Sequence, residues 1–249
     1  QKKIAEILSA VDEAIEEITE VRAKVSALSS DLTFRLVYQG LGHKRLKESE
    51  IGRIPDRWAV VPLERIATIE RGKFQHRPRN EPRFYGGKYP FIQTGEVTNA
   101  GGRIRSYTQT LNEEGLAISK LFPKGTILIT IAANIGETAI TDFDVAFPDS
   151  IIGIVAGDKV DNRFLEYYLR TRKTHLNSLA PQSAQKNINL ETLRPYPVSL
   201  PPKEEQVRIA DVLDAIHEET FRTDEILRQW TGLKNSLMQV LLTGKRRIA

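Results

Sequence analysis

The spacing of hydrophobic residues predicts two long amphipathic helices, one over residues 1–40 and one over residues 203–249. In each stretch apolar residues recur at alternating steps of three and four, close to the 3.5-residue average of a seam between two helices. The residues expected to pair the helices are Ile4, Leu8, Val11, Ile15, Ile18, Val25, Leu28 and Leu32 in the first, and Ile209, Leu213, Ile216, Leu227, Trp230, Leu237 and Leu241 in the second. We expect an antiparallel coiled coil; the alternative is that each helix packs singly on the domain between them.

The two stretches are copies of one sequence. Residues Gln1, Ile4, Ala5, Leu8, Ala10, Glu13, Glu20, Leu28, Leu32 and Leu36 align in one register with Gln206, Ile209, Ala210, Leu213, Ala215, Glu218, Glu225, Leu233, Leu237 and Leu241. In the same register Ile7 matches Val212 and Val21 matches Ile226. At 1.5 Å per residue each helix would be roughly 50–60 Å long. Gly40 and Gly42 are placed to end the first helix.

Between the copies the pattern changes to short apolar runs punctuated by glycine and proline. Thr126–Ala132 and Ser150–Ala156 are apolar and rich in β-branched residues, which predicts buried strands. Ala59–Ile69 is strand material interrupted by Pro62, and Asp161–Lys173 is a helix capped by Asp161 or Asn162. The stretch 72–102 has the composition of a loop, apart from an expected strand at 91–94.

This order of elements predicts an α+β fold. We expect one globular α/β domain at residues 59–200, joined by a connector at 43–58 to a long helix at 1–42 and followed by a second long helix at 201–249.

Composition limits the classes of function. The 249 residues are 40% hydrophobic and contain no cysteine, so disulfides, thiolate catalysis and cysteine-ligated metals are excluded. No apolar run approaches the length of a membrane span, and the four histidines have no metal-ligand spacing. We therefore expect a soluble protein with no membrane partner and no cofactor.

The positive charge is concentrated in the middle of the chain. Residues 51–200 carry 20 Lys and Arg against 15 Asp and Glu, and residues 71–105 alone carry eight basic residues against two acidic ones. Arginine and lysine can contact phosphates, while arginine, glutamine and asparagine can bond base edges. The candidate DNA-binding residues are Arg71, Lys73, Gln75, Arg77, Arg79, Arg83, Lys88, Gln93, Thr94, Asn99, Arg103, Arg105, Tyr107, Asn134, Gln182, Ser183, Lys186 and Asn187. The alternative is a solvated basic surface.

Motifs for catalysis are absent from the sequence. Thr243-Gly244-Lys245 is a helix end before a basic tail and not a phosphate-binding loop, and Leu200-Pro201-Pro202-Lys203 lacks the partners that an adenine-methylating motif requires. Asp149 and Asp158-Lys159 resemble a nuclease motif, but they flank a predicted buried strand, so a turn at the strand end is the better interpretation. We expect a chain without catalytic residues.

The chain resembles the specificity (S) subunits of type I restriction-modification systems along nearly all of its length. The matching segments, weak singly but specific in order and spacing, are Ile54-Pro55-Asp56-Arg57-Trp58 with Leu63, Gly72-Lys73, Tyr89-Pro90-Phe91-Ile92-Gln93-Thr94-Gly95-Glu96-Val97, Leu121-Phe122-Pro123-Lys124-Gly125, Gln182-Ser183-Ala184-Gln185-Lys186-Asn187, and Leu200-Pro201-Pro202 with Glu205-Gln206, Ile209-Ala210 and Leu213. Thr126 departs from the pattern, since the family often has Asp there.

The resemblance implies a non-catalytic subunit in which a target-recognition domain reads half of a split sequence in double-stranded DNA. It also implies that paired helices space two such domains and dock two methyltransferase subunits, which a restriction and translocation subunit then joins. The expected location is the cytoplasm of a prokaryote. The alternative from another class is a coiled-coil adaptor that binds protein and no DNA.

The first helical copy begins at Gln1, the counterpart of Gln206, so the equivalent of residues 201–205 does not precede it. We expect the chain to be the C-terminal half of a longer subunit, with the central conserved helix, the second recognition domain and the C-terminal conserved helix. The other half-site would then be read by a recognition domain in cis. The competing hypothesis is a half-length subunit that forms a homodimer on an inverted repeat.

Overall fold

The computed structural model describes residues 2–132, 134–181 and 187–242, and the chain divides into two compact units. The helical unit comprises residues 1–34 and 211–249, and the globular unit comprises residues 35–210. Helix α1 (Lys2–Gln39) and helix α7 (Lys203–Leu242) each contribute to both units. No helix in these described ranges combines the length and the apolar character needed to cross a membrane.

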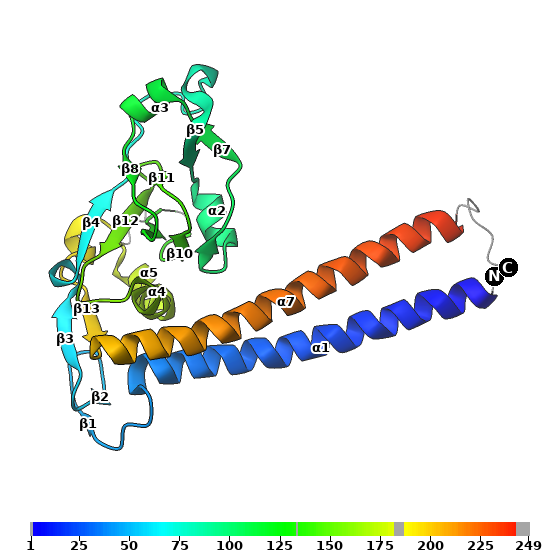
Figure 1. Ribbon diagram of the computed structural model, residues 1–249, viewed down its shortest axis with the longest axis horizontal. Coiled ribbons are helices and arrows are strands. Elements are labelled where there is room, and N and C mark those ends of the chain that lie inside the picture. Colours follow the sequence, from blue (N-terminus) through cyan, green and yellow to red (C-terminus); the bar gives the residue numbers. More distant parts are fainter. Residues whose placement is uncertain (1, 133, 182–186, 243–249) are drawn as a thin grey trace. The chain divides into compact units, whose positions relative to one another are not determined.

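In the helical unit α1 and α7 lie side by side and run in opposite directions (Figure 1). Two ion pairs join them, Arg22 with Asp224 and Asp12 with Lys234 (2.6 Å). Moving ten residues back along α1, from Arg22 to Asp12, corresponds to moving ten residues forward along α7, from Asp224 to Lys234. The predicted antiparallel pairing is therefore confirmed.

The seam between the helices follows alternating steps of four and three. In α7 every position of the seam is buried or half-buried, and the positions are Leu213, Ile216, Thr220, Thr223, Leu227, Trp230, Lys234, Leu237 and Leu241. In α1 the same steps run through Ile4, Leu8, Val11, Ile15, Ile18, Arg22, Val25, Ser29 and Leu32. Polar residues at seam positions favour one register over its alternatives.

Leu28 does not belong to this seam, so its predicted pairing role is wrong. From Ile18 the steps lead through Arg22 and Val25 to Ser29, and Leu28 points about 100° away from Ser29 around the helix. Its side chain is 60% exposed. The prediction included Leu28 because it is hydrophobic, whereas the seam position is occupied by its neighbour Ser29, a small polar residue.

The globular unit is built on a five-stranded sheet with the strand order β4-β12-β9-β10-β6. The strands are β4 (Ala67–Arg71), β12 (Ile151–Ala156), β9 (Ile127–Thr130), β10 (Thr138–Thr141) and β6 (Arg103–Ile104). Neighbours are antiparallel except β10 and β6. Every residue of β9 and the first four of β12 are buried, which confirms the two predicted strands.

A second sheet corrects the prediction of a loop over residues 72–102. Its order is β7-β5-β11-β8, with β7 (Gln109–Leu111), β5 (Tyr85–Phe91), β11 (Val145–Ala146) and β8 (Leu121–Phe122). The 3₁₀ turn η2 (Pro82–Phe84) precedes β5. Gly86 has a φ of 81°, and the register between β5 and β7 shifts between Tyr85 and Tyr89. Glycine thus produces an irregular strand here instead of a loop.

The predicted strand at 91–94 is also wrong. Strand β5 ends at Phe91, and Gln93 caps the short helix α2 (Thr94–Asn99). The Gln93 side chain accepts a bond from the backbone of Glu96, and the Glu96 carboxylate accepts the Gln93 amide at 2.8 Å. This capping box makes helix the favoured local structure.

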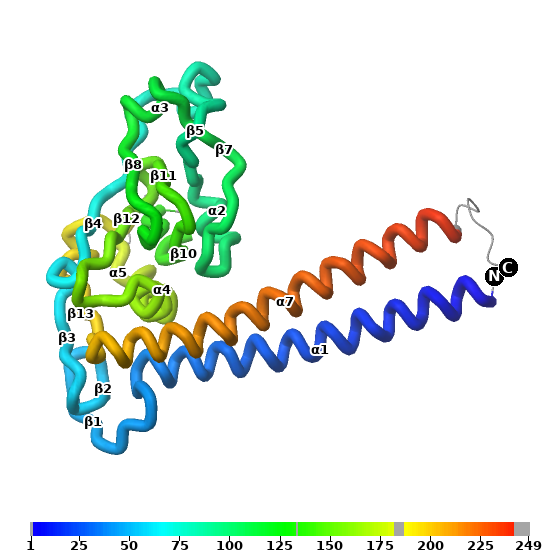
Figure 2. Tube along the Cα trace, viewed as in Figure 1, coloured from blue at the N-terminus to red at the C-terminus, as the bar shows by residue number. Residues whose placement is uncertain are grey.

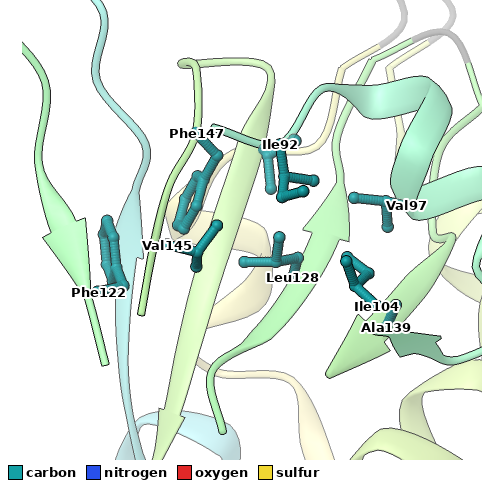
Figure 3. Close-up of a cluster of buried hydrophobic side chains, with 9 residues drawn as sticks. Ile92, Val97, Ile104, Phe122, Leu128, Ala139, Val145 and Phe147 are labelled. Carbon is teal, nitrogen blue, oxygen red and sulfur yellow. The ribbon is translucent and has the colours of Figure 1, made fainter. Parts of the chain in front are cut away.

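One hydrophobic core lies between the two sheets and α2. Ile92, Val97 from α2, Ile104 from β6, Leu128 from β9 and Phe147 converge there (Figure 3). The Phe122 and Phe147 rings stack with centroids 4.4 Å apart. Gly72 approaches this core so closely that a Cβ atom would lie 2.4 Å from Phe147.

The globular unit contains four further helices in its described part. Helix α4 (Asn162–Thr171) begins with Asp161, whose side chain accepts the amides of Arg163 and Phe164, so the predicted cap is confirmed. The shorter helices are α3 (Glu113–Ala117), α5 (Lys173–Leu179) and α6 (Leu190–Leu193).

The start of α7 is anchored within the globular unit. Strand β3 (Ala59–Pro62) pairs with β13 (Pro197–Leu200), as the tube in Figure 2 also shows, and β1 (Leu46–Lys47) pairs with β2 (Ile54–Pro55). The turn η1 (Leu63–Arg65) follows β3. The buried Glu205 carboxylate accepts bonds from Trp58 Nε1 (3.1 Å), His43 Nε2 (2.6 Å) and the Leu41 amide (3.2 Å). This joint holds the end of α1, the connector and the start of α7 together.

Candidate nucleic-acid interface

Three arginines converge on Asp149 at one end of the main sheet. Arg71 is the last residue of β4, and its Nε donates to the carbonyl of Asp149. Arg77 Nη2 lies 3.1 Å from Asp149 Oδ2, and Arg79 pairs with Asp149 Oδ1. The Asp149 carboxylate therefore pairs with two guanidinium groups, and the third bonds the carbonyl of the same residue, which leaves the group positive.

The arginines are held in place while remaining open to solvent. Arg77 Nη1 donates to the carbonyls of Phe74 (2.6 Å) and His76 (2.8 Å). The side chains of Arg77 and Arg79 are 50% and 36% exposed. Fixed donors that still reach solvent can contact an anion with little loss of side-chain freedom.

Asn134 and Asn187 lie at the same end of the sheet. Thr130, the last residue of β9, is opposite Ile151 of β12, and Ile152 is opposite Arg71. Beyond β9, Ala132 forms a bridge with Asn187, and Asn134 is exposed. We call Arg71, Arg77, Arg79, Asn134 and Asn187 the strand-end cluster. Gln182, Ser183 and Lys186 lie outside the described residues.

A pocket of about 260 Å³ gathers a second group of the predicted residues. It lies between α2 and β6, and its lining includes Asn99, Arg103, Arg105 and Tyr107. Glu96 closes one side, because Thr108 bonds its Oε1 through both the amide (3.1 Å) and the hydroxyl (3.0 Å). We call this the α2–β6 pocket. Tyr107 is 45% exposed and packs edge-on against Phe143 at 5.0 Å.

Gln93 and Thr94 have structural partners in the helix that forms one wall of this pocket. Gln93 caps α2, and its Nε2 donates to Gln109 Oε1 at 3.1 Å. Thr94 opens α2 and accepts the Thr98 hydroxyl at its carbonyl (3.0 Å).

The remaining predicted residues do not join either group. Lys73 and Gln75 are exposed on both sides of the buried Phe74, and Arg83 stacks over Phe84 at 4.6 Å. Lys88 lies on β5, where its Nζ is 3.1 Å from Glu113 Oε1. This hydrogen bond raises the pKa of Lys88 and lowers the pKa of Glu113.

The aromatic residues of the basic segment pack mainly on one another. Phe74, Phe84 and Phe91 are buried together with Leu111, and Tyr85 packs against them. The Phe74 and Phe91 rings are 5.2 Å apart. They build a small second core, so Tyr107 is the most exposed aromatic ring in the described part of residues 71–107.

The sequence did not reveal that Asp149 bonds the three arginines, and it suggested only that Asp149 resembles part of a nuclease motif. No group of three acidic or histidine side chains in the described ranges is arranged to hold a metal ion. The sequence pattern also did not single out Glu166 and Arg170, which form an ion pair between a buried carboxylate and a half-buried guanidinium. The sequence does contain a signal for this ion pair, because Glu166 and Arg170 are spaced i, i+4 on a predicted helix.

The sequence is similar to a family of known proteins. Residues 55–228 match the family described as the type I restriction modification DNA specificity domain. In Methanocaldococcus jannaschii, the protein named as the MjaX type I restriction enzyme specificity subunit is 32% identical over 253 residues, which cover all of this chain and 57% of that protein. The MjaVIII specificity subunit of the same organism is 29% identical, with 100% of this chain and 60% of that protein covered.

Solved structures share the fold. The HsdS subunit from Thermoanaerobacter tengcongensis aligns with a TM-score of 0.64 and 19% identity, over 96% of this chain and 56% of that one. The S subunit of a type I system from M. genitalium aligns with a TM-score of 0.65 and 15% identity, over 95% and 59% of the two chains. The chain thus spans somewhat more than half the length of these relatives.

The family match covers well over half of the chain, and the identity to the MjaX subunit extends along all of it. The chain belongs to the type I restriction-modification DNA specificity family.

Proposed function

We propose that this chain is a specificity subunit that binds double-stranded DNA and reads one half of a bipartite target for a type I restriction-modification complex. The observation that carries the proposal is the strand-end cluster, in which arginine and asparagine residues from distant segments lie at one end of the sheet. In this role the chain performs no chemistry, and partner methyltransferase and restriction subunits supply it.

The chemistry of the cluster suits a DNA backbone and its bases. Guanidinium groups bond phosphate oxygens or the O6 and N7 atoms of guanine in a bidentate manner, and asparagine does so with adenine. The excess of positive charge at Arg71, Arg77 and Arg79 attracts a polyanion, and this attraction weakens as salt screens it.

Binding to a pool of randomised DNA duplexes tests the proposal. The purified chain, or its complex with the methyltransferase subunits, is expected to enrich one short motif, and its affinity is expected to fall steeply between low and high salt. Affinity that does not change with salt would argue against phosphate contacts.

Arginine substitutions locate the interface. Arg77→Ala with Arg79→Ala should weaken DNA binding and lower the salt slope by about one for each phosphate that the variant no longer neutralises. Arg194→Ala provides a matched control, because Arg194 is an exposed arginine of the same unit that follows α6. An equal drop in affinity for the control would mean that overall charge, and not this cluster, determines the affinity.

Replacing Arg83 together with Arg77 and Arg79 separates this function from that of a coiled-coil adaptor without DNA binding. An adaptor has no DNA affinity to lose and keeps its protein partner when Arg77, Arg79 and Arg83 are replaced. A specificity subunit loses DNA affinity and also keeps its partners.

We further propose that the helical unit docks two methyltransferase subunits through an exposed apolar flank. The flank consists of Val21, Leu28, Val212, Ile226 and Leu233. Each of these residues comes immediately before a seam position, and within each helix they are separated by multiples of seven residues. Each is between 42% and 60% exposed. An antiparallel pair has a two-fold axis perpendicular to the plane of its helices, so this position falls on the same flank of both helices.

Duplication of the sequence makes the flank symmetric. Val21 matches Ile226 and Leu28 matches Leu233 between the copies, although packing between α1 and α7 requires none of them. Asp12 and Asp224, which make the ion pairs, follow seam positions by one and therefore lie on the opposite flank. The two halves of this flank are equivalent, which suits two copies of one partner.

The length of the helices sets the spacing in this proposal. The 40 residues of α7 correspond to about 60 Å, which would separate two half-sites. The second half-site would be read by another recognition domain in cis or by a homodimer partner, and a restriction and translocation subunit would join the assembly.

Charged substitutions on the flank test docking. Leu28→Glu with Leu233→Glu should abolish co-purification with the cognate methyltransferase subunit and leave the helical content unchanged. Ser26→Glu is the matched control, since Ser26 is exposed and follows seam residue Val25 on the other flank. Docking that survives both flank substitutions would contradict this part of the proposal.

A further inference from the structure

Glu166 is a fully buried acid whose acceptor atoms are occupied by two neighbours. It lies on α4 with 0% exposure, and its Oε1 accepts the Thr138 hydroxyl of β10 at 2.9 Å. Arg170, one turn later, donates Nε to Oε1 (3.0 Å) and Nη2 to Oε2 (2.7 Å). This bidentate pairing, with the carboxylate itself held by the threonine hydroxyl, restricts the Arg170 side chain to one orientation.

That orientation places the Arg170 guanidinium against the backbone of Gly102. A Cβ atom on Gly102 would lie 1.6 Å from Arg170 Nη2, so a side chain at this position would displace the Arg170 head group. Gly102 has a φ of 103°, and its carbonyl accepts the Ile140 amide of β10 at 2.9 Å. The head group of Arg170 thus determines where the turn before β6 lies.

The same support extends to the α2–β6 pocket. Arg103 follows Gly102 directly and begins β6, and its guanidinium lies 5.8 Å from the centre of the Tyr167 ring. Arg170 lies 5.0 Å from the centre of the same ring. From the other side, Val97 of α2 and Ile104 of β6 are anchored in the core between the two sheets and α2 (Figure 3). The walls of the pocket are therefore fixed by the core on one side and by α4 on the other.

We propose that Glu166 and Arg170 are positioning residues that shape the α2–β6 pocket for reading bases. This inference rests on the proposed DNA-binding function and assigns the pocket, with Asn99, Arg103 and Arg105, to base recognition, while the strand-end cluster mainly contacts phosphates. Base recognition needs side chains held within a fraction of an ångström, whereas phosphate contacts tolerate more freedom.

A purely stabilising role explains this pair less well. Burying the Glu166 carboxylate costs hydration, which offsets much of its attraction to the half-buried Arg170. A hydrophobic pair of similar size would fill the same space. Only the guanidinium, however, presents a flat and fixed surface to Gly102.

The experiment compares Arg170→Lys and Glu166→Gln with Arg163→Lys, a control on the same helix whose arginine pairs with Asp161. Each full-length variant is assayed on the duplex that the wild-type chain selects from a randomised pool and on an unrelated duplex. We expect Arg170→Lys and Glu166→Gln to lower the ratio of the two affinities on the order of ten-fold, with unrelated DNA bound as before. Arg163→Lys should keep the wild-type ratio.

A second pair of variants keeps the test decisive if Glu166→Gln does not fold. Gly102→Ala displaces Arg170, whereas Gly86→Ala, also at a positive φ of 81°, meets nothing within 4 Å. Gly102→Ala should lower the affinity ratio and Gly86→Ala should not.

The outcomes separate this inference from the proposed function. A wild-type chain that enriches no sequence overturns both. A wild-type chain that enriches a motif, together with Arg170→Lys and Gly102→Ala variants that retain its affinity ratio, overturns the positioning role alone.

Discussion

Replacing Glu205 by alanine should destabilise the globular unit by about 2–4 kcal/mol. The carboxylate accepts three hydrogen bonds, from Trp58 Nε1 at 3.1 Å, His43 Nε2 at 2.6 Å and the Leu41 amide at 3.2 Å. A buried donor left without an acceptor costs about 1–3 kcal/mol. Trp58 is 1% exposed and incurs that penalty in full, while His43 and Leu41 are nearer to solvent and incur less.

Glu205→Gln should have an intermediate effect of about 1–2 kcal/mol. The amide keeps one acceptor oxygen, but its NH₂ group faces a donor on the other side. Glu204→Ala is the control, because Glu204 is an exposed neighbour in the first turn of α7, where a negative charge is worth about 0.3–1 kcal/mol.

Urea unfolding provides the measurement. Trp58 and Trp230 are the two tryptophans of the chain, so in a Trp230→Phe background the fluorescence reports on Trp58 and the globular unit. An unfolding free energy for Glu205→Ala within about 0.5 kcal/mol of that for Glu204→Ala, judged against the usual range for surface substitutions, would refute the reasoning.

Three further predictions concern packing and charge. Leu32→Ala, at a half-buried seam position, should lower stability by about 1–2 kcal/mol in thermal melts, whereas Leu28→Ala, at a side chain 60% exposed, should change it by less than about 0.5 kcal/mol. Gly72→Ala, whose Cβ would lie 2.4 Å from Phe147, should destabilise the globular unit in urea, whereas Gly95→Ala, which meets nothing within 4 Å inside α2, should be neutral or slightly stabilising. A double-mutant cycle on Arg22 and Asp224, side chains 46% and 35% exposed, should give a coupling of about 0.2–1 kcal/mol that disappears in about 1 M salt.

Elements governed by local chemistry could be predicted from the sequence. The long helices follow from the steps of three and four, the strands β9 and β12 from continuous β-branched runs, and the start of α4 from the capping side chain of Asp161. In each case the residues that decide the structure are close in sequence, so their pattern is enough.

Elements governed by tertiary contacts could not be predicted in the same way. Residues 85–91 contain two glycines and a proline, and they form a strand because Phe91 is buried with Phe74 and Leu111, which are distant in sequence. Leu28 was placed in the seam because hydrophobicity does not distinguish it from its neighbours, whereas the register depends on Ser29 and on the ion pairs to α7.

The family signature acquires a physical basis in the joint around Glu205. The segment that ends in Trp58 and the segment that contains Glu205-Gln206 are far apart in the chain, yet Trp58 bonds Glu205 directly. Gln206 accepts the Asp161 amide at 2.8 Å and donates to the Pro201 carbonyl at 2.8 Å. These two segments of the resemblance therefore hold residues that attach α7 to the globular unit, and none of the proposed DNA-contacting residues lies in them.

The candidate site shows what a charge count leaves out. The sequence groups Arg71, Arg77 and Arg79 as free positive charges, but all three bond Asp149, about 70 residues later. A carboxylate at the centre lowers the charge that a phosphate meets, and it also fixes the directions of the donors. Asp149 therefore gives up part of the attraction for an anion and keeps Arg71, Arg77 and Arg79 pointing in fixed directions. Under the proposed function, these fixed donors would set the register of the chain on the DNA backbone, while base recognition falls to the α2–β6 pocket.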